Sequence, residues 1–429
     1  MDDAFKIQQV NALQVLDSRG RPTLKVIVKT KSGAGYGYAP SGASRGEREA
    51  IELRDGGKKW LGYGVMRAIT IVETMIKPRL VGLDSRYQAF IDSVLIALDG
   101  TPNKSKLGGN TTTATSIAVA RSAADTASLE LFEYLGGPGA RLLPTPLLNV
   151  INGGVHAGNE LNIQEFMIIP VGADTFYDAM RMAVEVYGIL KKILKEKYGL
   201  SAVNVGDEGG FAPPIKQTRQ ALDLLIESIQ KAGYTVGTDF YLGIDAAASQ
   251  FYSNEEEVYH LDGKSYSPGD LVEYYAGLVD EYPIRYIEDP FHEDAFNDYA
   301  ELTRKIGKKV LIVGDDLYTT NTRYLEKGLE IKATNAVLVK INQIGTLTET
   351  IEFIRYAVSH GMRAIISHRS GDTEDPFIAD LAVAMTTGLI KTGAPARGER
   401  TAKYNRLLEI ESILQGSSQY AGVRPFKIG

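Results

Sequence analysis

The stretch that decides the fold is VLVKINQIGT, residues 337–346. Three apolar residues run into Lys340, and the turn-like segment QIGT follows at 343–346. An unpaired ammonium is costly to bury, so the ammonium group of a lysine in such a run is expected to reach a site where it has a function. A catalytic residue at the carboxyl end of a barrel strand has this form. A lysine that guards a sheet edge has it too, so the surrounding sequence has to decide.

Three other apolar runs end in acids: YLGI in Asp245, YI in Glu288 and VLIVG in Asp315. Each run is typical of a buried parallel strand, and helix-like sequence follows each one. Acids at the same end of neighbouring strands converge, and carboxylates sharing a dry site need a cation, for which Mg²⁺ is suited. One such acid would simply cap the next helix. Three in succession, followed by Lys340, favour a metal site.

The composition excludes several classes of function. Of 429 residues, 44% are hydrophobic and 23% charged, as in an ordinary globular protein. The formal net charge of -6 gives no basic surface for nucleic acid. With 0 cysteines there is no thiol chemistry, which fits a reducing compartment. The acidic start lacks a signal-peptide core, and no apolar run is long enough to span a membrane. We expect a cytoplasmic protein with neither nucleic acid nor membrane as partner.

Two domains are predicted. Alternating residues at 24–29 and a turn-like segment at 31–35 predict strands, and mostly helical periodicity follows at 47–135. Strands followed by helices indicate an α+β unit, and GGPG at 136–139 marks its end. Strand-like and helix-like segments then alternate almost to the end, as in a parallel α/β barrel. We predict an α+β domain at 1–138 and a barrel domain at 139–429.

Loops of small residues carry further candidates. PSGASRG at 40–46 is either a lid or a plain linker. GDEGG at 206–210 sets Glu208 between glycines, which let the backbone approach a ligand closely. SHRSG at 367–371 suits a phosphate or oxyanion, although a surface turn with a salt bridge has the same sequence. A last strand-like run ends in Lys391.

Together these motifs resemble those of the enolases, and their number and order make the match specific. The similarity covers essentially the whole chain, in DSRG at 17–20, SGAS at 41–44, NGGVHAGN at 152–159, QEFM at 164–167, VGDEGGFAP at 205–213, IEDPF at 287–291, GDDL at 314–317, KINQIGTL at 340–347, SHRSG at 367–371 and KTGAPAR at 391–397.

The resemblance implies an eight-stranded enolase-type barrel with an N-terminal α+β capping domain. The barrel is expected to start with two strands and two helices before regular alternation. The implied reaction is the reversible, magnesium-dependent dehydration of 2-phospho-D-glycerate to phosphoenolpyruvate, in glycolysis and gluconeogenesis. The implied assembly is a homodimer or a higher homo-oligomer.

The resemblance also implies a role for each matching residue. Lys340 is the expected base and Glu208 the acid, with Glu165 assisting. Two Mg²⁺ ions are expected, the first on Asp245, Glu288 and Asp315 and the second on Ser44 of the lid. The residues expected around the substrate are His156, Gln164, Glu165, Lys340, His368, Arg369, Ser370 and Lys391.

The chemistry agrees with these roles. Removing a proton beside a carboxylate builds a highly charged intermediate, which cations stabilise. A lysine base with Mg²⁺ is the general pattern of enolase-superfamily sites. We expect cationic surroundings to lower the pKa of Lys340. We also expect crowding between Glu208 and Glu165 to raise one carboxyl pKa, so that the pair holds the proton for the leaving hydroxide.

The lid departs from the family pattern at Arg45, where the enolases usually have threonine. Its guanidinium either approaches the substrate phosphate when the lid closes or points to solvent. If it approaches the phosphate, Arg45→Thr raises KM and weakens its dependence on salt. Steady-state kinetics across ionic strengths distinguish the two, because an unchanged KM means that Arg45 points to solvent.

Three alternative functions would use a similar set of residues. Racemases and cycloisomerases of the enolase superfamily commonly carry Lys-x-Lys on the second barrel strand, where this chain has Gln164-Glu165-Phe166. A surface adhesin is disfavoured because the chain ends in KIG, without the C-terminal lysine invoked for that role. A magnesium-dependent phosphatase needs the same acids and phosphate grip, and phosphate release distinguishes it.

Overall fold

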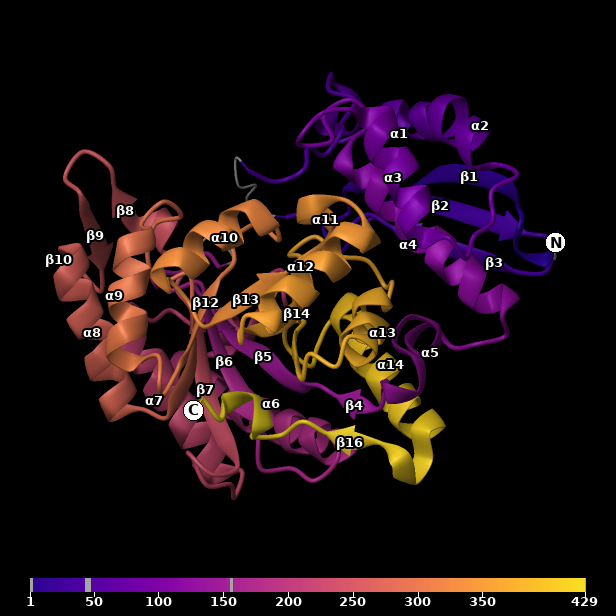
Figure 1. Ribbon diagram of the computed structural model, residues 1–429. Coiled ribbons are helices and arrows are strands. Elements are labelled where there is room, and N and C mark those ends of the chain that lie inside the picture. The colour runs from indigo at the N-terminus through magenta and orange to yellow at the C-terminus, as the bar shows by residue number, and fades with distance from the viewer. Residues whose placement is uncertain (1–2, 43–47, 155–156, 429) are drawn as a thin grey trace.

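The computed structural model describes residues 3–42, 48–154 and 157–428, and it has two parts (Figure 1). The N-terminal part is a three-stranded antiparallel sheet with helices packed against it, and the second is a closed eight-stranded barrel. The predicted fold class is therefore confirmed. No helix in the described part of the chain has the length and apolarity needed to cross a bilayer.

The N-terminal sheet explains the alternating sequence at 24–28. Leu24, Val26 and Val28 are fully buried, while the residues between them are partly exposed, as the two-residue period of a strand requires. The sheet comprises β1 (Ile7–Leu16), β2 (Pro22–Thr30) and β3 (Ala34–Tyr38). The helices of this part are α1 (Met66–Ile71), α2 (Lys77–Leu80), α3 (Gln88–Asp99), α4 (Gly109–Thr126) and α5 (Leu131–Gly136).

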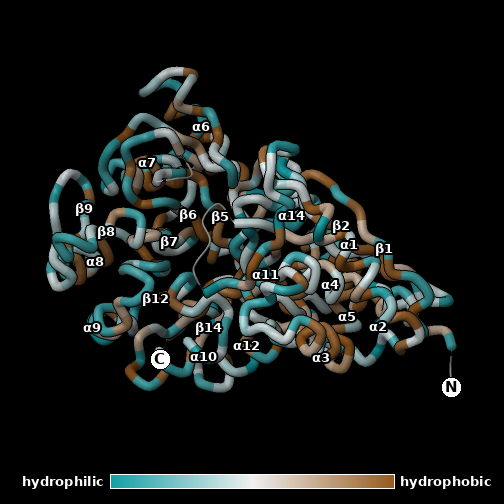
Figure 2. The backbone as a smooth tube through the Cα atoms, turned by 90° about the horizontal axis from the view of Figure 1, so that it is seen from above, coloured by the Kyte–Doolittle hydropathy of each residue, from teal (hydrophilic) through white to brown (hydrophobic). Residues whose placement is uncertain are grey.

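Helix α4 is the centre of the N-terminal domain. Every residue from Gly109 to Ala120 is buried. The helix packs on β2 and β3, and it also contacts α11 (Ile341–Ile344) and α12 (Leu347–Ser359) of the barrel domain; α11 lies beside it in Figure 2. An added Cβ on Gly35 or Gly37 would lie 2.2 Å from the α4 backbone. These two glycines therefore allow the close packing of helix and sheet.

The barrel confirms the expected irregular start. Strand β6 is antiparallel to both of its neighbours, and the other barrel pairs are parallel. Two strands and two long helices thus precede the regular alternation. The barrel strands are β5 (Thr145–Asn152), β6 (Glu165–Pro170), β7 (Phe240–Asp245), β11 (Ile284–Glu288), β12 (Leu311–Gly314), β13 (Ala336–Val339), β14 (Arg363–Ser367) and β15 (Leu389–Lys391).

Helices surround this barrel, and short strands lie outside it. The helices are α6 (Phe176–Tyr198), α7 (Thr218–Lys231), α8 (Pro268–Glu281), α9 (Phe296–Ile306), α10 (Thr322–Ile331), α11 (Ile341–Ile344), α12 (Leu347–Ser359), α13 (Phe377–Ala384) and α14 (Gly398–Leu414). The outer strands are β4 (Leu142–Leu143), β8 (Tyr252–Ser253), β9 (Val258–Leu261), β10 (Lys264–Tyr266) and β16 (Gln419–Tyr420).

The capping domain holds the segment that follows Lys340. The side-chain amide of Asn342, in α11, donates to the carbonyl of Pro40 at 3.1 Å. The backbone N–H of Thr348, in the first turn of α12, donates to the buried carboxylate of Asp92 at 3.0 Å. Contacts with the other domain therefore position the turn after β13, which carries the candidate base.

Candidate active site

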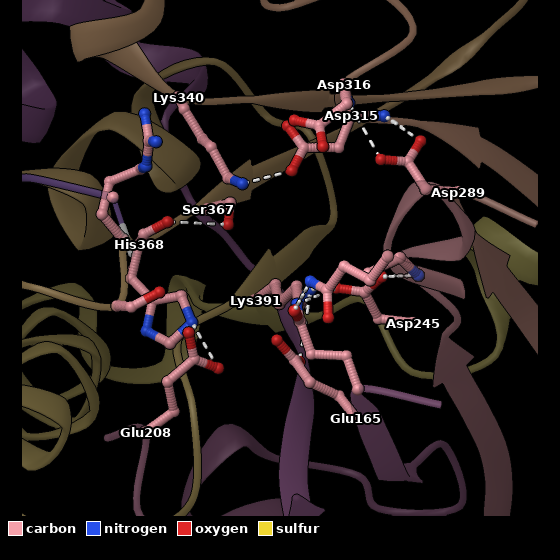
Figure 3. A pocket seen from close by; sticks show the side chains of 16 residues that line it. Glu165, Glu208, Asp245, Asp289, Asp315, Asp316, Lys340, Ser367, His368 and Lys391 are labelled. Atoms are coloured by element: carbon pink, nitrogen blue, oxygen red, sulfur yellow. Dashed lines mark hydrogen bonds and ion pairs between the residues drawn. The ribbon is translucent and has the colours of Figure 1, made fainter. Parts of the chain in front are cut away.

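A pocket opens at the carboxyl ends of the barrel strands (Figure 3). Polar and charged side chains make up nearly all of its wall. The lining residues are Gly42, Gln164, Glu165, Glu208, Asp245, Ala247, Gln250, Asp289, Asp315, Asp316, Lys340, Ser367, His368, Arg369, Ser370 and Lys391. Glu288 is buried directly beside them, and Ser44, Arg45 and His156 lie outside the described residues.

The alternation of the strands aims the key side chains into this pocket. In β13, Ala336 and Leu338 belong to the apolar cluster inside the barrel. Lys340 comes two positions after Leu338 and therefore faces the same way. The same spacing from an interior residue holds for Asp315 after Val313, Glu288 after Tyr286, Lys391 after Leu389 and Glu165 before Met167.

The ammonium of Lys391 lies among three carboxylates. Its Nζ is 2.9 Å from Asp245 Oδ2, 2.8 Å from Glu288 Oε2 and 3.3 Å from Glu165 Oε2. Burial and the charge of Asp245 raise the pKa of Glu288 to about 8. Burial acts to lower the pKa of Lys391, but the surrounding carboxylates outweigh it and raise that pKa well above its usual range. The crowded acids thus favour a cation between them.

Lys340 is paired with Asp315, which lies at the end of the neighbouring strand. Burial is the largest effect and acts to lower the pKa of Lys340, but the attraction of the Asp315 and Glu288 carboxylates contributes to a net rise. This direction is opposite to the one expected for Lys340 among cations, because the protein side chains alone place a carboxylate directly against the ammonium.

Glu208 and Glu165 are electrostatically coupled, as expected. Burial raises the pKa of Glu165 well above its usual range, and the negative charge of Glu208 adds to the effect. Glu208 Oε2 accepts a hydrogen bond from Asn149 at 3.2 Å and lies 3.5 Å from His368 Nε2. Figure 3 shows Glu208 and His368 side by side at the pocket wall.

Arg369 has a partner that the sequence did not reveal. Its guanidinium forms two parallel hydrogen bonds with the carboxylate of Glu49 in the capping domain, at 2.9 and 3.1 Å. It also donates to the side chain of Asn342 at 3.1 Å. The planar fork is thus held rigidly across the domain boundary, at a wall of the pocket.

Comparison with known proteins agrees with this geometry. Residues 7–135 match the family model described as the enolase N-terminal domain, and residues 140–428 match that of the enolase C-terminal TIM barrel domain. The chain belongs to the enolase family. The enolase of Aeropyrum pernix is 61% identical over 97% of this chain and 96% of its own length. The enolases of Methanocaldococcus jannaschii and Pyrococcus furiosus are 54% and 52% identical, over 98% and 100% of each chain.

Enolases are phosphopyruvate hydratases, so the chain is a lyase of this class. Two of the expected metal ligands, Glu288 and Asp315, each have a second acid directly after them in the sequence. The oxygens of Asp289, Asp315 and Asp316 lie within 4.8 Å of one another, and this group is an alternative to the expected ligand set. Asp289, however, accepts the backbone N–H groups of Asp315 and Asp316, both at 2.9 Å. This pattern indicates a structural carboxylate rather than a ligand.

Sequence reasoning also missed residues behind the expected enolase site. Gln250 donates to Gln164 at 2.6 Å, and Gln164 Nε2 lies 3.4 Å from Asp245 Oδ2. Arg400, in α14, contacts His368 from behind. Gln250 lies in the short helix Ala248–Phe251 beyond the end of β7 and Arg400 lies in α14, so neither is the residue that ends a barrel strand and no strand-end signal points to them.

Proposed function

We propose that the chain catalyses the reversible, Mg²⁺-dependent dehydration of 2-phospho-D-glycerate to phosphoenolpyruvate, in the cytoplasm. The observation that carries the proposal is the arrangement of one pocket. A lysine and a coupled pair of carboxylates line the same cavity, and clustered acids with a second lysine lie between them. This arrangement provides a base, an acid and a means of stabilising the negative charge that builds up between their two steps.

The donor set fits a magnesium ion. Asp245, Glu288 and Asp315 supply hard oxygen ligands, and burial together with the charge of Asp245 raises the pKa of Glu288, so a bound cation would stabilise its ionised form. We infer that they hold the first Mg²⁺ and that Ser44 contributes to a second. Bound Mg²⁺ supplies Lewis-acid stabilisation of the enolate charge.

The chain's own residues supply the proton transfers. Lys340 removes the proton at C2 of the substrate, and Lys391 stabilises the carboxylate group of the substrate next to that carbon. Glu208, assisted by Glu165, then donates a proton to the departing hydroxide, which is otherwise a poor leaving group. Arg369 and Ser370 bind the phosphate, and the remaining contacts to the substrate come from His156, Gln164 and His368.

A direct assay tests this function. Adding 2-phosphoglycerate and Mg²⁺ to the purified protein should produce the ultraviolet absorbance of an enol phosphate, and adding a chelator should abolish it. Release of inorganic phosphate without that absorbance would instead indicate a phosphatase. Activity on carboxylates that lack a phosphate would indicate a racemase or cycloisomerase.

We place the domain boundary at 138/139, in the segment between α5 and β4.

We also propose a homodimer with a reversed charge pair. In the family pattern, a glutamate on the second strand pairs across the interface with an arginine of the C-terminal helix. This chain has Lys25 and Glu409 at those positions. Glu409 lines a surface groove with Tyr36, and Lys25 Nζ lies 4.9 Å from the centre of the Tyr36 ring. The two residues therefore lie near one groove, where an isologous interface would use both.

A double-mutant cycle tests the reversed pair. Lys25→Glu should weaken the dimer, because it faces Glu409 with a like charge. Adding Glu409→Arg should recover much of the loss, with a coupling of about 1 kcal/mol or more between neighbours. Sedimentation at several concentrations measures the dissociation constant. Strictly additive effects would show that the two residues do not meet.

A further inference from the structure

Arg400 is a fully buried cation whose contacts all lie behind the active site. Its side chain has 0% exposure, and it projects from the first turn of α14. Nη1 donates to Arg369 O at 2.7 Å, and Nη2 donates to Ser370 O at 2.6 Å and to Asp207 O at 3.0 Å. One guanidinium thus joins the loop after β14 to the loop that carries Glu208.

Besides an ion pair with Glu399, in which Nε lies 3.5 Å from Oε1, the remaining contact of Arg400 is with an imidazole. Nη1 lies 2.6 Å from His368 Nδ1. A guanidinium has only donors, so His368 Nδ1 must be the unprotonated ring nitrogen that accepts this hydrogen bond. In the neutral ring the proton then lies on Nε2. Burial, assisted by the charge of Arg400, lowers the pKa of His368 to about 4, so the ring is neutral at physiological pH.

The protonated nitrogen of His368 faces the candidate acid. Nε2 is 3.5 Å from Glu208 Oε2, and Asn149 Nδ2 donates to the same oxygen at 3.2 Å. The Nε2–H tautomer of His368 therefore places a donor beside this oxygen, in addition to the amide of Asn149.

We propose that Arg400 is a positioning residue, which fixes His368 as the Nε2–H tautomer and so keeps an N–H donor facing Oε2 of Glu208. The inference rests on the proposed role of Glu208 as the acid. A carboxyl group held in one orientation by such a donor needs no reorientation before it transfers its proton, which is the benefit of a preorganised site. Without Arg400, either nitrogen of His368 is free to carry the proton, and Oε2 loses a fixed donor.

A purely structural role would give a different result. In that case Arg400 would only tie two loops together, and its removal would lower the stability and both half-reactions alike. If Arg400 is a positioning residue, its removal lowers mainly the rate of dehydration, which is the step that uses Glu208. Exchange of the C2 hydrogen depends on Lys340 and is largely spared.

The first experiment is ¹⁵N NMR of the wild-type protein, labelled only at histidine and measured near neutral pH. The chain has 5 histidines, and His368→Gln identifies the signal of interest by its disappearance. We expect His368 to be neutral, with a protonated Nε2 and an unprotonated Nδ1. A proton on Nδ1 would overturn the proposal, and the result needs no substrate or metal.

The second experiment uses variants at the same position. In Arg400→Met we expect His368 to populate both tautomers and dehydration to fall about 100-fold, the size of effect that misplacement produces. Exchange of the C2 hydrogen should fall far less. Arg400→Lys keeps one charged N–H donor for Nδ1 and should restore the Nε2–H tautomer and much of the dehydration rate.

Lys403→Met is the matched control. Lys403 is a buried cation on the same helix, and its ammonium contacts Asp372 and the carbonyls of Thr373 and Glu399. This variant should lower stability without changing the His368 spectrum. Equal losses of exchange and dehydration in Arg400→Met, with an unchanged tautomer, would overturn the proposal.

If Arg400→Met does not fold, the wild-type spectrum and the Arg400→Lys variant still test the proposal. A change of tautomer in Arg400→Lys without any loss of dehydration would overturn the proposal, because the tautomer would then have no effect on the step that uses Glu208. A separate result tests the proposed function, which fails if the wild-type protein does not dehydrate 2-phosphoglycerate. The spectrum would still report the tautomer of His368 in that case.

Discussion

Lys340→Ala is expected to abolish exchange of the C2 hydrogen of 2-phosphoglycerate with solvent, and dehydration with it. Lys340 faces the pocket from the end of β13, and a positioned base accounts for about 10²–10⁴-fold in rate. The loss should therefore be of at least that order. Exchange is measured by ¹H NMR in deuterated buffer, and dehydration by the absorbance of the product.

Glu208→Gln separates the second half-reaction from the first. The amide cannot donate the proton that the hydroxide needs, so dehydration should fall by a similar factor while exchange continues. Lys309→Ala, which removes an exposed lysine far from any strand-end carboxylate, serves as the control and should retain both activities. If Lys340→Ala still exchanged the C2 hydrogen, the roles of base and acid would have to be reassigned.

The strand-end residues were predictable because a strand has a strict two-residue period. Once an apolar run that ends in Lys340 or Asp315 is known to be a barrel strand, its two-residue period fixes the direction in which that side chain points. The same counting resolves the acid pairs. Glu288 and Asp315 are in phase with the interior residues Tyr286 and Val313, whereas Asp289 and Asp316 are out of phase.

The supporting residues were not predictable, because their contacts depend on how distant segments pack. Glu49 lies in an irregular segment of the capping domain, and it meets Arg369 only because the two domains are docked. Arg400 is one of several charges in a helix, and its local sequence resembles a solvated face. The raised pKa of Lys340 also depends on a distance to Asp315 that motif spacing does not provide.

Two carboxylate sets are candidates for the proposed magnesium site, and Asp315 belongs to both of them. One set is completed by Asp245 and Glu288, and the other by Asp289 and Asp316. Asp315→Asn should therefore weaken Mg²⁺ binding and activity together under either assignment, with the fold intact. Unchanged Mg²⁺ affinity of this variant in calorimetry would refute a metal site at these strand ends.

Glu288→Gln and Asp316→Asn separate the two sets, because each removes one negative charge and keeps the shape of the side chain. Glu288 faces the barrel interior and is fully buried against Lys391, whereas Asp289 uses its carboxylate to hold the backbone beside Asp316. Glu288→Gln should thus weaken Mg²⁺ binding by about 100-fold or more, since even partners outside the ligand set cost 10–100-fold. Asp316→Asn should weaken it by less than about 10-fold, the lower end of that range. Titration calorimetry at fixed pH measures both affinities, with circular dichroism to show that each variant is folded. The reverse order of effects would move the ion to the Asp289, Asp315 and Asp316 group, and Lys391 would then be the permanent counterion of Asp245 and Glu288.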